Sequence, residues 1–220
     1  MLENITAKNP EEIENFESIR EEAIEILTEF ESETYFMDEG GAGKVYELPG
    51  GLCMKVLIER HLMTDSQIYN LGNSVAEETK IQEQMARTDY SGETRVPKTF
   101  AYLSGTYPVE RSAILMEKLD GVNLQHILNG TKELPESFDV NKFFDALEDF
   151  IDHMHRVEKI AHLDLYARNI MVDNETSVPY VIDFGRSERL TNSEEDKAKM
   201  EHDWQRFDEV LKGIKALQDK

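Results

Sequence analysis

The 220-residue sequence has a single cysteine, Cys53, and no long apolar run. One cysteine excludes a disulfide within the chain and is typical of a reducing compartment. No apolar stretch approaches the ~20 residues that a membrane-spanning helix needs. Residues 1–5 form neither a basic nor an apolar segment, so no secretory signal is visible. We therefore expect a cytoplasmic protein, and delivery into another cell by a specialised route stays open.

Basic residues are scarce: 24 Lys and Arg stand against 45 Asp and Glu, a formal net charge of −21. This charge repels phosphate backbones and anionic lipids, so we expect no nucleic-acid and no membrane partner. A basic protein, as substrate or as regulatory partner, is the electrostatic complement. The alternative is that the acidic surface only keeps the protein in solution.

The hydrophobic pattern divides the chain into three predicted parts. Residues 1–33 contain an amphipathic helix that either packs on the protein's own body or binds a partner. Residues 34–119 show short β-like runs and one helix, and residues 120–220 are mainly helical. The strands are expected at 35–37, 43–48, 52–57, 99–103 and 112–116, and the longer helices at 9–31, 73–87, 141–160 and 196–217.

Two short motifs near the C-terminal end carry the chemistry. His162 to Asn169 reads H-x-D-x-x-x-x-N, and Asp183-Phe-Gly follows fourteen residues after Asn169. A carboxylate at Asp164 can lie beside an attacking hydroxyl. The oxygens of Asn169 and Asp183 suit Mg²⁺, which neutralises phosphate charge during phosphoryl transfer. The pair of motifs indicates a phosphotransferase.

The order of these motifs resembles that of the protein kinase-like superfamily over about residues 35 to 210. The resemblance implies an α+β, two-lobed fold, with a five-stranded antiparallel sheet and one helix in the N-lobe and a reduced, mainly helical C-lobe. It implies ATP and Mg²⁺ as cofactors. In this family Asp164 would orient the acceptor hydroxyl, Asn169 and Asp183 would hold Mg²⁺, and His162 would support the loop by bonding backbone near Asp183.

Further family positions follow upstream. Gly40, Gly41 and Gly43 resemble the glycine-rich loop over the phosphates, although Asp38 replaces its first glycine. Lys55 resembles the strand lysine that contacts the α and β phosphates. Its partner would be Glu78, which shares a helix face with Ile81 and Met85, or alternatively Glu77.

The adenine site is predicted by the same resemblance. Met116 would be the gatekeeper, and the backbone of Glu117 and Leu119 would bond adenine. The remaining predicted contacts to the ring are apolar side chains from three separate strands: Val45, Cys53 and Met171.

Several positions depart from the family pattern. Leu163 replaces the Arg that usually receives an activation-loop phosphate, so we expect no activation by such phosphorylation. Tyr166 stands where serine/threonine kinases carry Lys. Only 35 residues follow Gly185, and Asp203-Trp204 would brace the catalytic loop from the last helix. Such minimal kinases resemble the injected effector kinases of enteric pathogens and the small kinase of the KEOPS complex.

The sequence therefore predicts an ATP- and Mg²⁺-dependent protein kinase, with Ser/Thr as the expected acceptor. Tyr stays open as acceptor, because the Ala-Arg-Asn run at 167–169 resembles that of receptor tyrosine kinases. Two alternatives stay open. One is an ATP-binding scaffold or regulatory module that acts through a protein partner. The other is a small-molecule kinase, which shares H-x-D-x-x-x-x-N but uses a helical substrate pocket that this sequence does not indicate.

Overall fold

The structure is a computed structural model that describes residues 5–7, 16–28, 35–40, 43–57, 74–87, 90–104 and 112–218. The chain forms two compact units. Unit 1 comprises residues 1–80 and 98–118, and unit 2 comprises residues 81–97 and 119–220. Each unit has its own hydrophobic core, so each is described by itself.

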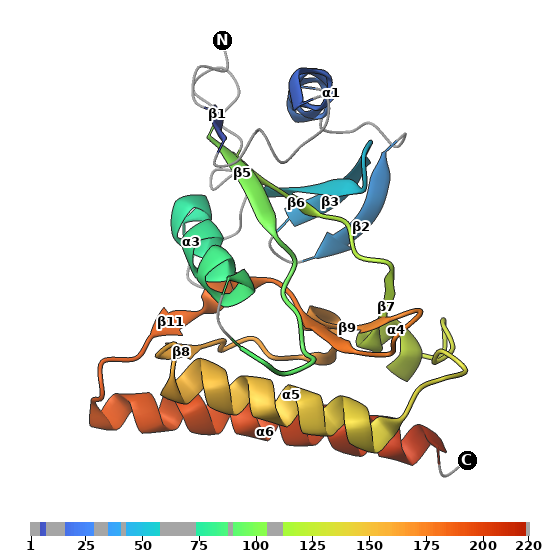
Figure 1. The fold of residues 1–220 in the computed structure, drawn as a ribbon, viewed down its shortest axis with the longest axis vertical. Coiled ribbons are helices and arrows are strands. Elements are labelled where there is room, and N and C mark those ends of the chain that lie inside the picture. Colours follow the sequence, from blue (N-terminus) through green and yellow to red (C-terminus); the bar gives the residue numbers. More distant parts are fainter. Residues whose placement is uncertain are drawn as a thin grey trace, which may run out of the picture. The chain divides into compact units, whose positions relative to one another are not determined.

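Unit 1 is built on one antiparallel sheet with the strand order β1-β5-β6-β4-β3-β2 (Figure 1). The strands are β1 (Ile5–Ala7), β2 (Phe36–Gly40), β3 (Gly43–Leu48), β4 (Leu52–Leu57), β5 (Thr99–Ser104) and β6 (Ser112–Glu117). The five predicted strands are present, and β1 adds a short sixth strand at the edge beside β5.

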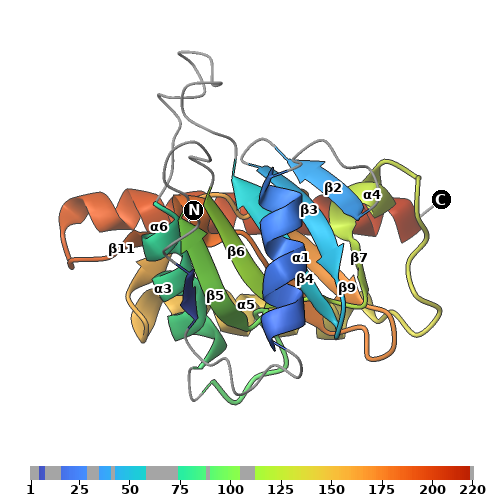
Figure 2. The same cartoon turned by 90° about the horizontal axis from the view of Figure 1, so that it is seen from above.

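A tight turn sets the β3–β4 hairpin. Gly50 and Gly51 both adopt φ near +74°, a left-handed conformation that favours glycine, and Leu48 pairs with Leu52 across the turn. Helix α1 (Phe16–Thr28) lies across the sheet (Figure 2). Its buried residues Ile19, Ala23 and Ile26 belong to the apolar cluster of the sheet. The amphipathic helix is thus part of the core of unit 1.

Helix α3 (Val75–Ala86) matches the helix expected at 73–87 to within two residues. Its predicted inward residues Val75, Ile81 and Met85 are all buried. Ile81 and Met85 contribute to the core of unit 2.

Unit 2 combines helices with two small antiparallel sheets, β10-β9-β7 and β11-β8. Its helices are α4 (Leu124–Leu128), α5 (Val140–Arg156) and α6 (Glu194–Gln218), with short 3₁₀ turns η3 (Ala167–Asn169) and η4 (Phe184–Arg186). Its strands are β7 (Gly121–Asn123), β8 (Ile160–Ala161), β9 (Ile170–Asp173), β10 (Pro179–Val181) and β11 (Glu188–Arg189). Helices α5 and α6 lie side by side (Figure 1).

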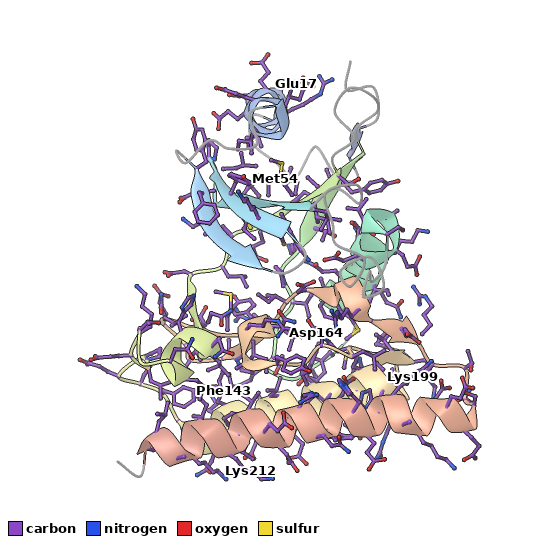
Figure 3. The ribbon with its side chains drawn as sticks, turned by 180° about the vertical axis from the view of Figure 1, so that it is seen from behind. Glu17, Met54, Phe143, Asp164, Lys199 and Lys212 are labelled. Atoms are coloured by element: carbon purple, nitrogen blue, oxygen red, sulfur yellow. The ribbon has the colours of Figure 1, made fainter. Side chains whose placement is uncertain are left out.

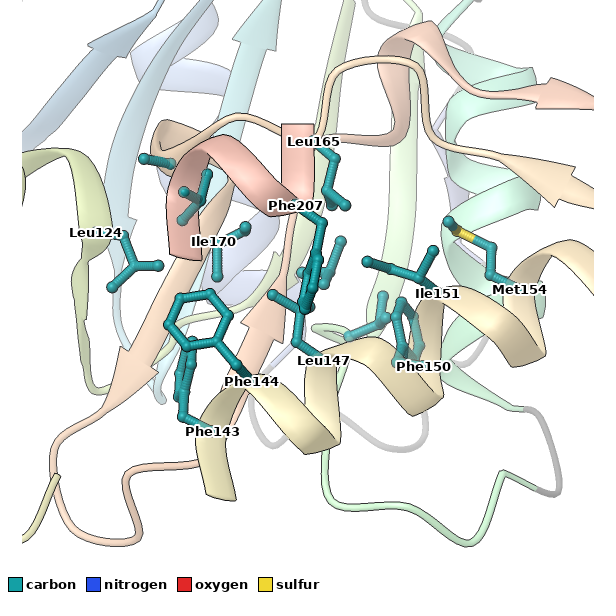
Figure 4. Close-up of a cluster of buried hydrophobic side chains, with 14 of the residues drawn as sticks. Leu124, Phe143, Phe144, Leu147, Phe150, Ile151, Met154, Leu165, Ile170 and Phe207 are labelled. Atoms are coloured by element: carbon teal, nitrogen blue, oxygen red, sulfur yellow. The ribbon is translucent and has the colours of Figure 1, made fainter. Parts of the chain in front are cut away.

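Helix α5 presents one apolar face to the core of unit 2 (Figure 4). The spacing of apolar residues over 141–160 predicts a buried face of seven residues, and six of them are buried: Phe143, Phe144, Leu147, Phe150, Ile151 and Met154. The prediction is wrong for the seventh, Val157, which is 62% exposed. The helix ends at Arg156 rather than near Ile160, and Lys159 turns the chain at φ 58° into strand β8. Val157 therefore lies beyond the buried face.

The longest helix of the described ranges is α6, with 25 residues. It carries charged side chains along most of its length, among them Lys199 and Lys212, which Figure 3 labels. No helix in these ranges combines the length and apolarity needed to cross a bilayer.

Candidate functional site

Lys55 lies in the middle of β4, between Val45 of β3 and Ile114 of β6. Side chains alternate along a strand, and Leu52, Met54 and Val56 face the core shared with α1, so Lys55 faces the other side. Its Nζ lies 2.7 Å from Oε1 of Glu78, and both residues are buried. A buried lysine is costly without a partner, so this ion pair explains how an apolar strand holds a charge.

Glu77, the alternative partner for Lys55, lies beside a lysine of its own helix. Its Oε2 is 3.7 Å from Nζ of Lys80, its own helical neighbour, and its side chain is partly exposed. Glu78 is therefore the carboxylate that forms the 2.7 Å ion pair with Lys55.

The glycine-rich segment forms the turn between β2 and β3. Gly40 and Gly43 face each other across the two strands, and Gly41 lies outside the described residues. A Cβ at Gly43 would come within 2.3 Å of the backbone oxygen of Val56. Close approach of β4 therefore requires a glycine at this position, whatever else the segment binds.

The predicted adenine contacts of unit 1 lie on neighbouring strands. Cys53 and Met116 are register partners across β4 and β6, and Cys53 Sγ lies 3.6 Å from the carbonyl oxygen of Glu117. The N–H of Glu117 donates to the carbonyl of Lys98, and the carbonyl of Glu117 accepts from the Cys53 thiol. Val45 on β3 is half-buried.

Burial raises the pKa of the Cys53 thiol to about 12. The thiol is therefore protonated at neutral pH and acts as a small apolar group rather than a nucleophile.

The other two predicted adenine contacts belong to unit 2. Leu119 is half-buried directly before β7. Met171 lies on β9, in register with Asn123 of β7 and Tyr180 of β10.

The predicted catalytic loop, residues 162–169, brings Asp164 and Asn169 together. Nδ2 of Asn169 donates to the backbone carbonyl of Asp164 at 2.7 Å and to its Oδ2 at 2.8 Å. Both residues are buried, and Asp164 is labelled in Figure 3. The amide group is thereby oriented by two bonds through its nitrogen, and Oδ1 of Asn169 is left for a ligand.

Asp183 follows β10 and takes a left-handed conformation, with φ 63°. Its carboxylate caps η4 by accepting from the N–H of Gly185 at 3.3 Å. Nε2 of His162 lies 3.1 Å from the carbonyl of Ile182, so the histidine bonds the backbone next to Asp183, as the sequence predicted. A left-handed non-glycine residue is strained, and such strain clusters at functional sites.

Asp203 of α6 braces the loop from beneath. Its fully buried carboxylate accepts the N–H groups of His162 and Leu163, both at 2.8 Å. Its Oδ2 also lies 2.9 Å from Nε2 of His155 on α5. These bonds hold Leu163 at φ 60°, and Leu163 directly precedes Asp164. The suggestion that Asp203-Trp204 anchors the loop therefore has a geometric basis.

Arg168 contacts Asp164, which the sequence did not predict. Its Nη2 lies 2.7 Å from Oδ1 and 2.9 Å from Oδ2 of Asp164. Oδ2 thus accepts from both Arg168 and Asn169, while Oδ1 accepts one short bond. A carboxylate has about four acceptor positions, so Oδ1 can still receive a hydroxyl. The sequence shows that Arg168 lies four residues after Asp164, but this spacing predicts a contact only when the conformation of the loop is known.

The donor set fits Mg²⁺ bound together with phosphates. Within the described residues, no group of three or more His, Cys, Asp or Glu side chains could hold a metal ion on its own. Mg²⁺ is usually held by one or two protein oxygens, substrate phosphates and water. Asn169 and Asp183 supply that kind of incomplete set.

The comparisons with known proteins agree with this geometry. The sequence matches the model of the protein kinase domain family over residues 38–218, and the chain belongs to this family. It is 26% identical over 152 residues to the mitogen-activated protein kinase kinase kinase MST11 of Pyricularia oryzae, covering 69% of this chain and 16% of the relative.

The crystal structure of WbdD is similar in fold, with a TM-score of 0.56 and 16% identity. The similarity covers 80% of this chain and 37% of WbdD. The chain thus spans well under half the length of both proteins.

Proposed function

We propose that this chain is an ATP- and Mg²⁺-dependent protein kinase that phosphorylates Ser or Thr hydroxyls. The observation that carries the proposal is the Lys55–Glu78 pair, a buried ion pair of 2.7 Å at the family's lysine position. Asp164 and Asn169, held together in the catalytic loop, give further support. The name of the relative MST11 favours a protein acceptor.

In this proposal each residue has a distinct task. ATP supplies the γ-phosphoryl group, and Mg²⁺ neutralises phosphate charge when bound. Lys55, kept in place by Glu78, would bind the α and β phosphates, and Asn169 and Asp183 would hold the metal. Asp164 orients the acceptor hydroxyl through Oδ1. The acceptor oxygen bonds to the γ phosphorus as the bond to the β–γ bridging oxygen breaks, ADP leaves and the hydroxyl proton passes to Asp164.

We further propose that the kinase needs no phosphorylation of an activation loop. Leu163 has no charge with which to receive a phosphate. The N–H groups of His162 and Leu163 are already bonded to Asp203, so the catalytic loop is braced from within unit 2. The kinase is then either constitutively competent or switched by a regulatory protein partner. The single cysteine supports a cytoplasmic location.

Transfer of ³²P from γ-labelled ATP to pooled Ser, Thr and Tyr peptides tests the proposal. The unphosphorylated wild type is compared with Lys55→Ala and Asp164→Ala, and with Lys142→Ala as an exposed control on α5. We expect transfer to Ser or Thr peptides by the wild type and the control, and loss of transfer in both site variants. ATP binding without phosphopeptide would favour the scaffold instead. Labelling that persists in both site variants would refute the site.

A further inference from the structure

The catalytic carboxylate lies among arginines in a chain that is otherwise strongly acidic. Arg168 bonds both oxygens of Asp164, and Nη1 of Arg186 lies 3.9 Å from Oδ1. The side chains of Arg168 and Arg186 are 49% and 48% exposed, so an incoming ligand can reach both. The two guanidinium groups and the one carboxylate together carry a net charge of +1.

Arg168 is held in place by more than its bond to Asp164. Its guanidinium carbon lies 4.4 Å from the ring centroid of Tyr166. The guanidinium carbon of Arg206, from α6, lies at the same distance from this ring, and Nη1 of Arg206 bonds Glu209 at 2.7 Å. Cation–π contacts on Tyr166 thus link Arg168 to α6. A guanidinium fixed before binding loses little side-chain freedom when it meets an anion.

The charges next to Asp164, rather than the net charge of the chain, determine the electrostatic environment of a bound acceptor segment. Exposed charges farther away than about 8 Å are largely screened at physiological ionic strength. The net charge of −21 therefore acts on the approach of a partner. Groups bound next to Asp164 meet the guanidinium groups of Arg168 and Arg186 instead.

We propose that Arg168 and Arg186 recognise a negative group beside the acceptor hydroxyl, so that the preferred acceptor is an acidic or previously phosphorylated segment. This inference rests on the proposed function. Because Asp164 orients the hydroxyl, a side chain next to that hydroxyl lies within reach of an arginine that contacts Asp164. Guanidinium binds carboxylate and phosphate alike, in fork geometry.

The competing role for Arg186 is to bind the γ-phosphate of ATP. The two roles differ in what they do to kinetics. A residue that reads the acceptor changes kcat/KM for acidic peptides and leaves the KM for ATP nearly constant. A residue that binds the nucleotide changes the KM for ATP and lowers the rate with every peptide by the same factor.

The test uses four peptides that differ only in the residues flanking one serine: glutamate, phosphoserine, glutamine or lysine. Wild type, Arg186→Gln, Arg186→Lys and Arg156→Gln are compared. Arg156 is a matched control, because it is exposed and its described ion pair is with Asp152 on the same helix. Circular dichroism and thermal melting verify that each variant is folded.

We expect the wild type to favour the acidic peptides over the glutamine peptide about tenfold in kcat/KM, or about 1.4 kcal/mol. Arg186→Gln should reduce this preference to about twofold, while Arg186→Lys keeps part of it and Arg156→Gln keeps all of it. The ratio between the glutamate and phosphoserine peptides identifies which anion is preferred.

Equal use of all peptides, or preference for lysine, would overturn the inference and leave the proposed function intact. A raised KM for ATP in Arg186→Gln, with the acidic preference unchanged, would assign Arg186 to the nucleotide and overturn it as well. Absence of transfer to every peptide would contradict the proposed function itself.

Discussion

Replacement of Asp203 by asparagine tests how the catalytic loop is held. The side chain is fully buried and accepts the N–H groups of His162 and Leu163 and the Nε2 of His155. Asn has nearly the same shape but only one acceptor oxygen, and its amide nitrogen donates. At least one of the backbone N–H groups would then face another donor and lose its partner.

The size of the loss follows from these contacts. A hydrogen bond to a charged group contributes about 1.5–3 kcal/mol, and a buried donor left unsatisfied costs about 1–3 kcal/mol. We expect Asp203→Asn to lower the free energy of unfolding by about 2 kcal/mol and Asp203→Ala, which removes all the bonds, by about 3–6 kcal/mol. Leu163 at φ 60° would be free to relax, so Asp164 would shift and kcat would fall further than stability alone explains.

Urea unfolding monitored by the fluorescence of Trp204, the single tryptophan of the chain, measures the effect next to the substitution. Asp208→Asn makes the same chemical change at an exposed position of α6 and should stay within about 0.5 kcal/mol of the wild type. An Asp203→Asn variant as stable and as active as Asp208→Asn would contradict this role of Asp203.

Three further predictions concern groups whose environment the structure defines. Lys55→Met should cost about 3–5 kcal/mol because it removes the lysine of a buried ion pair, and adding Glu78→Leu should restore much of the stability but no activity. Urea unfolding of the double-mutant cycle checks this, and additive losses would contradict it. The Cys53 thiol, with its pKa near 12, should resist iodoacetamide at pH 8 until urea unfolds the chain, and rapid labelling of the folded protein would speak against its burial. Burial alone would raise the pKa of Asp196, but hydrogen bonds from two backbone N–H groups lower it below its ordinary value. The ionised carboxylate therefore stabilises the folded protein above the unfolded pKa of about 3.9, and this stabilisation is lost as the pH falls through the folded pKa. Asp196→Asn should therefore destabilise the protein at pH 7 and flatten the acid limb of its stability curve, and an unchanged limb would refute this.

The local signals in the sequence predicted regular elements well. The bounds of β3 and β4 follow from short β-like runs on either side of the turn at Gly50 and Gly51, and the buried face of α5 follows from its three- and four-residue spacing. The prediction failed at Val157, where a left-handed Lys159 ends the periodicity. Short strands such as β7, β8 and β11 were not predicted, because two or three residues carry too little pattern.

The candidate site could be predicted where a motif names the residue, or where helix spacing singles one out, as it does for Glu78. Asp164, Asn169 and Asp183 were identified from the motifs, and their roles remain predictions. The bonds from Arg168 to Asp164 depend on the 3₁₀ turn at 167–169, whose loop Asp203 holds from 40 residues away in sequence. No local spacing encodes a contact of that kind. The position of Arg186 likewise depends on the left-handed turn at Asp183.

We propose above that Asp164, together with Mg²⁺ held by Asn169 and Asp183, supports phosphoryl transfer to protein hydroxyls. The most direct measurement is mass-spectrometric detection of phosphate on Ser and Thr peptides incubated with ATP and Mg²⁺, for the wild type and for Asp164→Asn and Asp183→Asn in parallel. We predict phosphopeptides with the wild type and only background with both variants, each folded as the wild type is. Equal phosphorylation by all three proteins, or none by the wild type, would contradict the account.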